Sequence, residues 1–437
     1  MHLFFQLLLA LFCFSMFFVR RETKLGILFF TGICIYEYTL PLKIGTAVSL
    51  VPLCFFISEW KAINSLLWGK RMVVSIIFYL GAISSLYTIV VSPHLHSPVS
   101  LLVFLMSEIF GKFMLPFAAL ICLGNIIETK RLFKYIYIAI LVMTVFSVQN
   151  YITRHSVYVD WLFDGKTLVD YLEDAGAKYT NAERFRIQGT FHNPFDYGYT
   201  CIVCFLLFYY GRINNYISSF RFYEVTLYCF WGITMSYCRT VWICAIMATL
   251  MSVLYYNSQS KRLGMIVFLL VATLFAVELV PSIQSAFDMM ISTFDQDSKV
   301  AGSSVEMREA QILAVLSLIQ GNEFFGMGHD YFSIDLGFSS GKSGLLDSDL
   351  QGLEGSYLVS LLETGIIGTL LYFGLIIYIL VWSLKQEIFK QRPAAFVFVL
   401  FVLFGTFGIM TGELRTAYIT FLTCGIAFRD TLKITDN

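Results

Sequence analysis

The sequence has few charged residues for its length. Of its 437 residues, 14% are Asp, Glu, Lys or Arg, whereas a soluble globular domain has about 25%. Apolar residues make up 57% of the chain, and the mean hydropathy is +0.72. Because one membrane span needs about 20 mainly apolar residues, this composition predicts a polytopic membrane protein and excludes an ordinary soluble domain.

The net charge is zero, and proline is rare. The 30 basic residues balance 30 acidic residues, so the chain has no basic field for nucleic acid, and we expect no nucleic-acid partner. Only 8 prolines and no Ser/Gly-rich linker are present, which favours one integral membrane domain over residues 1–437. Cys201 and Cys204 form a C-x-x-C inside an apolar run, where we interpret them as small buried hydrophobes.

The common cofactor motifs are missing. The sequence contains no Walker A, EF-hand loop, H-E-x-x-H or zinc-spaced Cys/His cluster. We therefore expect neither a metal nor a cofactor. A reaction on the outer face of a membrane would also lack ATP, so its substrate would be already activated and lipid-borne.

The apolar stretches predict an all-α bundle of about 12–13 transmembrane helices. The stretch Val99 to Ile127 is too long for one upright helix, and we expect it to bend near Gly111. Glu108 and Lys112 are four residues apart and are expected to form an ion pair. The predicted spans are 2–19, 25–41, 44–60, 72–92, 99–127, 132–152, 194–211, 222–237, 240–256, 264–282, 356–382, 394–411 and 417–429.

Basic residues gather in every second connection between these spans. Such loops are cytoplasmic in membrane proteins, so the pattern predicts the orientation of the bundle. It places both long polar loops, 153–193 and 283–355, on the outer side. The first apolar run lacks a basic segment before it and a cleavage site after it, whereas Arg20 and Arg21 follow it. We therefore expect an uncleaved anchor with its N-terminus outside.

Five arginines on the predicted outer side are candidate site residues. Arginine suits bidentate recognition of phosphate, and it stays charged near lipid. One interpretation is a cationic cradle for a lipid-linked phosphate; the alternative is headgroup anchoring and pairing between helices. The five are Arg184, Arg186, Arg239, Arg308 and Arg415.

The segment before the span at 194–211 contains His192, Asn193 and Pro194. Asn193 is expected to cap that helix, and proline favours its first turn. A helix N-terminus in a medium of low dielectric constant also binds anions, so His192 is a candidate substrate contact.

The segment 321–332 has Gly326 and Gly328 around Met327. Without a βαβ context a nucleotide loop is disfavoured, and a tight turn is expected. His329 follows the turn and is either a substrate contact or a solvated loop residue.

Glu354 and Tyr357 lie one helical turn apart at the start of the span 356–382. Glu354 is a candidate general base if partial burial raises its pKa. Alternatively it complements the helix dipole. Glu363 lies deeper in the apolar run and needs a partner.

This organisation resembles the O-antigen polymerase and O-antigen ligase superfamily of bacterial glycan assembly. The matching segments are RIQGTFHNPFDYGY from Arg186, MSYCRTVW around Arg239, the run from Arg308 to the Gly-x-Gly turn, and SYLVSLLETGIIG from Ser356. The resemblance implies two large periplasmic loops with functional arginines and a fold like the lipid-donor (GT-C-type) membrane glycosyltransferases.

The resemblance also suggests an activity. Family ligases carry His-Asn-x-Tyr before the last of these helices, where this chain has Glu354, Gly355, Ser356 and Tyr357. The missing histidine favours an inner-membrane polymerase, with an active site facing the periplasm, that uses an undecaprenyl-pyrophosphate-linked oligosaccharide. Membrane lipid and a chain-length regulator protein are the other expected partners. The alternatives are an O-antigen ligase, a peptidoglycan polymerase, and a polysaccharide flippase or other transporter.

Overall fold

The chain is built from α-helices. The computed structural model describes residues 2–35, 47–69, 72–93, 97–163, 186–191, 193–256, 305–329, 331, 355–386, 392–410 and 414–435. No strand occurs in these ranges, and several of the helices are apolar enough to cross a membrane. The predicted all-α polytopic bundle is therefore confirmed.

The helices follow the predicted apolar stretches closely. Most predicted spans that fall on described residues begin and end within a few residues of a helix, while the span predicted at 264–282 lies outside the described residues. The helices are α1 (His2–Ser15), α2 (Arg21–Phe30), η1 (Thr31–Ile35), α3 (Ala47–Ser58), α4 (Trp60–Leu67), α5 (Met72–Val91), α6 (Pro98–Leu105), η3 (Met106–Phe113), α7 (Leu115–Cys122), α8 (Ile126–Thr153), α9 (Val157–Phe163), α11 (Pro194–Ile213), α12 (Ser219–Met235), α13 (Arg239–Tyr256), α16 (Val305–Leu318), α17 (Ser356–Lys385), α18 (Arg392–Met410) and α19 (Leu414–Thr435).

Three of the described helices, α5, α8 and α17, are long and apolar enough to cross a membrane unaided. Two bent pairs raise that number to five if each pair counts as one span: α3 with α4, bent by 85°, and α6–η3 with α7, bent by 48°. The second pair is the long stretch predicted to bend near Gly111. Lys112 Nζ lies 2.7 Å from Glu108 Oε2 there, so the predicted ion pair is confirmed.

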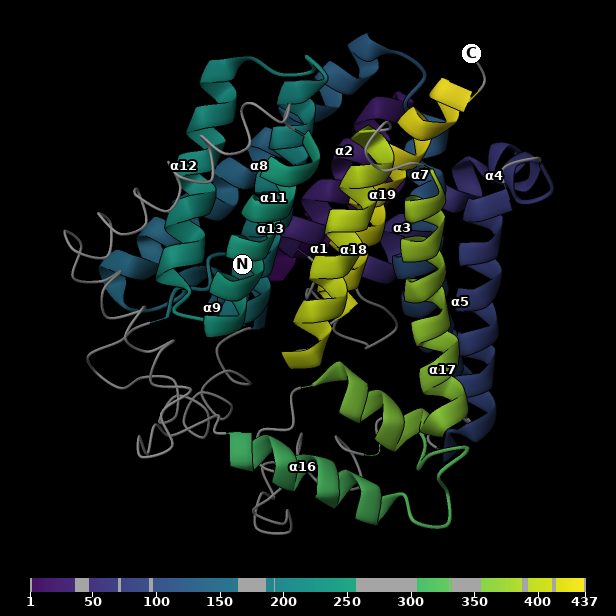
Figure 1. Ribbon diagram of the computed structural model, residues 1–437. Helices are drawn as coiled ribbons and strands as arrows, with labels where there is room; N and C mark the ends of the chain where they lie inside the picture. The colour runs from purple at the N-terminus through teal and green to yellow at the C-terminus, as the bar shows by residue number, and fades with distance from the viewer. Residues whose placement is uncertain are drawn as a thin grey trace.

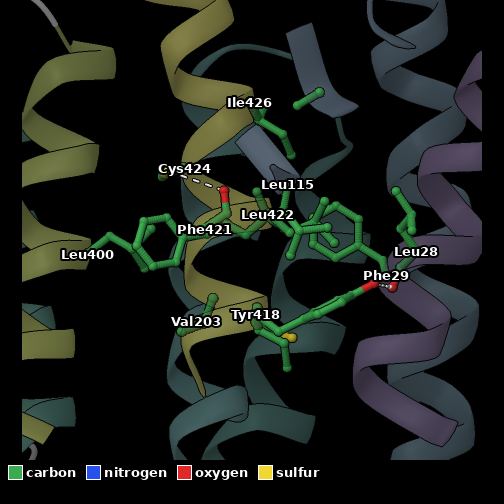
Figure 2. Packing of buried hydrophobic residues seen from close by; sticks show 14 of the residues in the cluster. Leu28, Phe29, Leu115, Val203, Leu400, Tyr418, Phe421, Leu422, Cys424 and Ile426 are labelled. Carbon is green, nitrogen blue, oxygen red and sulfur yellow. Dashed lines mark hydrogen bonds between the residues drawn. The ribbon is translucent and has the colours of Figure 1, made fainter. Parts of the chain in front are cut away.

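Helix α19 occupies the centre of the bundle. It packs against α7, α18 and α11, and its residues from Arg415 to Thr431 are buried. Figure 2 shows Tyr418, Phe421 and Leu422 of α19 among Leu400 of α18, Leu115 of α7 and side chains of α2 and α11. The predicted last span was the shortest, yet its helix has 22 residues, and all but one of its described side chains are buried.

Helix α16 and the start of α17, which carry or adjoin predicted site residues, lie at the same end of the bundle. Figure 1 shows α16 and the first turns of α17 at one end, with α9 toward that end and the C-terminus at the other. Helix α16 packs on α17 through an apolar cluster of Val315, Ile319 and Leu362. This packing positions the loop that follows α16.

Candidate functional site at one end of the bundle

Helix α17 is broken near its start. Gly365 has φ +62° and ψ −167°, a conformation that essentially only glycine adopts. The break interrupts the helical hydrogen bonds, and the loop after α16 replaces them. Met327 N–H donates to the Leu362 carbonyl and Gly328 N–H to the Glu363 carbonyl, both at 2.8 Å.

Two further bonds run in the opposite direction. Ile366 N–H donates to the Glu323 carbonyl at 2.9 Å, and Ile367 N–H donates to the Phe324 carbonyl at 3.2 Å. Backbone away from regular helix is tolerated at membrane depth only where protein or water satisfies it. We name this arrangement of residues 323–328 on residues 362–367 the backbone interlock.

Glycine makes the interlock possible. A Cβ on Gly365 would lie 2.6 Å from the backbone of Phe324 and Gly326, so the two segments meet without side chains between them. Gly326 and Gly328 have φ +74° and +104°, and the predicted tight turn is confirmed. Glu323 accepts the Gly321 N–H at 2.9 Å, and this backbone bond lowers the pKa of its exposed carboxyl.

The interlock fixes His329 at the end of the loop. The His329 N–H donates to Ser92 Oγ at 2.6 Å, and the imidazole lies 4.8 Å from the Phe104 ring, centroid to centroid. Its Nδ1 is 3.5 Å from Oε2 of Glu363. Glu363 is thus the partnered carboxylate, as expected, and its partner comes from the turn that the sequence singled out.

Three hydrogen bonds attach the start of α17 and the loop to other helices. The hydroxyls of Ser356 and Tyr357 donate to carbonyls of α18, those of Gly408 and Gly405 respectively. On the loop side, Tyr87 Oη donates to the Phe324 carbonyl at 3.1 Å. Tyr357 therefore lies against α18 at the start of α17.

The segments that contain Arg186 and Arg239 are linked by a backbone hydrogen bond. Ile187 N–H, next to Arg186, donates to the Met235 carbonyl at 3.0 Å, and Met235 ends α12 just before Arg239 begins α13. Both arginine side chains are half-buried. The Arg186 guanidinium lies 5.8 Å from the ring of Phe195.

The segment from 186 to 193 runs into α11 as predicted. Asn193 Oδ1 accepts the Phe195 N–H at 2.8 Å, and Pro194 is the first helical residue, so the predicted cap is confirmed. Asp196 follows in the first turn and is fully buried. A carboxylate at this position is favoured by the helix dipole.

Arg415 is buried beneath the same segment. Its side chain is 1% exposed and donates to the carbonyls of Gly32 at 2.9 Å, Ile33 at 2.7 Å and Thr190 at 3.4 Å. The guanidinium carbon lies 3.2 Å from the centre of the Phe191 ring. These contacts tie α19 to η1 and to segment 186–193.

Several predicted site residues are not described. Glu354, Arg184 and His192 lie outside the described residues. Arg308 is in helix α16, but its side chain lies outside them too. Sequence reasoning missed the helix break at Gly365; its only signal was a glycine after Glu363 in an otherwise apolar run.

The fold and this site define a multi-pass helical membrane protein with arginines and a histidine–glutamate pair on helix ends and loops. The family model described as O-antigen ligase, Wzy_C, matches residues 225–373, a range that includes α13, α16 and the interlock. The match is consistent with the O-antigen polymerase and ligase superfamily, and it supports a function of that general kind. No curated protein matches the chain.

Proposed function

We propose that this protein is a surface-polysaccharide (O-antigen) polymerase of the bacterial inner membrane. It transfers an undecaprenyl-pyrophosphate-linked glycan onto a sugar hydroxyl of another lipid-linked repeat unit at the periplasmic face. The observation that carries the proposal is the backbone hydrogen bond from Ile187 to Met235, which joins the segments bearing Arg186 and Arg239. It occurs in a chain whose residues 225–373 match the O-antigen ligase family model.

The proposed reaction makes two chemical demands. As the acceptor oxygen bonds to the anomeric carbon, the bond from that carbon to the pyrophosphate oxygen breaks, and the electron pair leaves with the lipid pyrophosphate. Fixed guanidinium groups stabilise this developing charge, for which we nominate Arg186, Arg239 and Arg308. The acceptor proton passes to a general base, for which Glu354 and His329 are the two candidates.

An O-antigen ligase that transfers the glycan to lipid A-core is the second candidate. The matching family model carries the description O-antigen ligase, and the match is compatible with either activity. The sequence Glu354-Gly-Ser-Tyr357 in place of His-Asn-x-Tyr favours the polymerase. A deletion strain separates the two, because loss of a polymerase leaves single repeats on the core, whereas loss of a ligase leaves none.

Transfer in vitro tests the proposal directly. The purified protein is incubated with a lipid-linked repeat unit, with lipid A-core added in a parallel reaction. We expect a ladder of longer lipid-linked glycans in the first reaction. Product only in the presence of lipid A-core would replace the polymerase by the ligase, and no product in either reaction would count against both.

Arg308 supports a sharper test of the cationic cradle. We expect Arg308→Ala to lower kcat at least 100-fold, because loss of one preformed charge stabiliser costs about 10²–10³ in rate. Arg308→Lys keeps the charge but loses the bidentate geometry, so its kcat should lie between those of the wild-type protein and Arg308→Ala. Arg20→Ala, at an exposed arginine, is the matched control. Full activity of Arg308→Ala would show that Arg308 is not part of the cationic cradle.

A further inference from the structure

We propose that Glu363 is a positioning residue that holds His329 as the base for the acceptor hydroxyl. The inference rests on the proposed transfer reaction and chooses between its two candidate bases. It assigns the proton-accepting role to Nε2 of His329, the ring nitrogen opposite the one that faces Glu363. His329 is then the catalytic residue, and Glu363 acts through it.

The backbone and the ring of His329 are both held in place. Ser92 accepts its N–H at 2.6 Å, and Gly328, one residue earlier, donates to the Glu363 carbonyl at 2.8 Å. Phe104 packs against the imidazole. A base needs this kind of fixed geometry, because misplacement by about 1 Å can cost 100-fold in rate.

Glu363 therefore contacts the loop twice, once through its backbone and once through its side chain. Its Oε2 lies 3.5 Å from His329 Nδ1. A carboxylate beside one imidazole nitrogen fixes the proton on that nitrogen and directs the other toward a substrate. Contacts of this kind are often long before substrate binds and shorten in the reacting complex.

The helix break explains why a carboxylate at position 363 matters. Glu363 lies two residues before Gly365, in the last turn of the first half of α17. The C-terminal end of a helix carries partial negative charge, which stabilises a cation beside it. The Glu363 side chain is 13% exposed, so its interaction with a charged neighbour is weakly screened. The helix end and the carboxylate are therefore both suited to stabilise a positive charge that develops on His329.

Proton transfer produces that positive charge. The acceptor hydroxyl gives its proton to Nε2 of His329 while its oxygen bonds to the anomeric carbon, and the pyrophosphate leaves with the electron pair. His329 becomes an imidazolium beside the Glu363 carboxylate. Release of the proton to water restores the neutral ring.

A purely structural ion pair between His329 and Glu363 is the competing explanation, and kinetics separate the two. We expect Glu363→Gln to lower kcat at least tenfold with the KM for the acceptor changed less than twofold, and His329→Asn to lower kcat at least 100-fold. Glu363→Asp keeps the charge and should retain more activity than Glu363→Gln. Glu309→Gln, an exposed carboxylate on α16, is the matched control and should be unchanged.

Two kinetic outcomes would overturn the inference. One is wild-type kcat, within twofold, in either Glu363→Gln or His329→Asn. The other is a loss of kcat in Glu354→Gln greater than that in His329→Asn, which would make Glu354 the base. If the wild-type protein forms no product in the transfer assay, the proposed function fails first, and that result is distinct from either of these.

A spectroscopic measurement tests the positioning without any turnover. The chain has 6 histidines, so ¹⁵N-histidine labelling with a His329→Asn reference assigns the His329 signals. At a pH where the ring is neutral, we expect the proton on Nδ1. A neutral ring with its proton on Nε2 would overturn the inference.

Discussion

At the residue scale, Arg415 shows how a charged side chain can be accommodated inside the bundle. An arginine within a membrane protein is costly unless its donors are satisfied. Here three carbonyls and an aromatic ring surround the guanidinium, and two of those carbonyls belong to the π-helix η1. The contacts account for its burial without a bound anion, while its predicted part in substrate binding stays a prediction.

Replacement of Arg415 should therefore lower stability. Arg415→Ala removes three hydrogen bonds to buried carbonyls, and we expect it to destabilise the protein by about 3 kcal/mol or more. The stability of Arg415→Lys should lie between those of the wild-type protein and Arg415→Ala, since an ammonium group cannot reproduce the planar guanidinium with its several N–H donors. Thermal unfolding in detergent measures the effect, with Arg20→Ala, at an exposed arginine, as control. A midpoint equal to the control would contradict the structural role.

Individual residues also show what the sequence could predict. The cap at Asn193 and the pair Glu108–Lys112 depend on neighbours within four residues, so local spacing was sufficient. The burial of Arg415 depends on Gly32 and Ile33, more than 380 residues earlier. Periodicity and charge pattern contain no information on such a contact, which is why Arg415 looked like an outer-surface arginine.

At the element scale, the backbone interlock makes one unit of the α16 loop and the break in α17. Each segment supplies N–H and carbonyl groups to the other, so neither is satisfied alone. The turn at Gly326 was predictable from two nearby glycines. The break was not, because ETGIIG reads as continuous apolar helix and its stabilising partners lie about 40 residues away.

Gly365→Ala should disrupt this unit. The new Cβ would meet the Gly326 and Phe324 backbone at 2.6 Å, and alanine disfavours φ +62° by about 1–3 kcal/mol. We expect a lower unfolding midpoint and faster proteolysis within residues 323–329. Gly374→Ala is the matched control in the same helix, because nothing lies within 4 Å of its Cβ. The control should be neutral or slightly stabilising. Equal behaviour of the two variants would show that the interlock does not constrain α17.

At the scale of the whole molecule, the two ends of the bundle differ in character. One end has the interlock, segment 186–193 and helix α16. Toward the other end, interhelical ion pairs connect α2 with its neighbours, including Lys24 with Glu59 at 2.7 Å and Arg131 with Glu22 at 3.1 Å. Basic residues are typical of cytoplasmic helix ends, so the predicted orientation places this end in the cytoplasm, and it stays a prediction.

Labelling from one side of the membrane tests that orientation. Glu309 is exposed on α16 at the predicted outer end, and Ser219 is exposed at the start of α12 at the predicted inner end. We expect an impermeant maleimide to label Glu309→Cys in spheroplasts, and to label Ser219→Cys only after permeabilisation. The unsubstituted chain is the control, because eight of its cysteines are buried and Cys13 and Cys54 are half-buried in apolar helices. The opposite pattern would invert the bundle and place the arginines and His329 in the cytoplasm. A lipid-linked periplasmic substrate could not reach them there, so this result would contradict the proposed polymerase and ligase functions together.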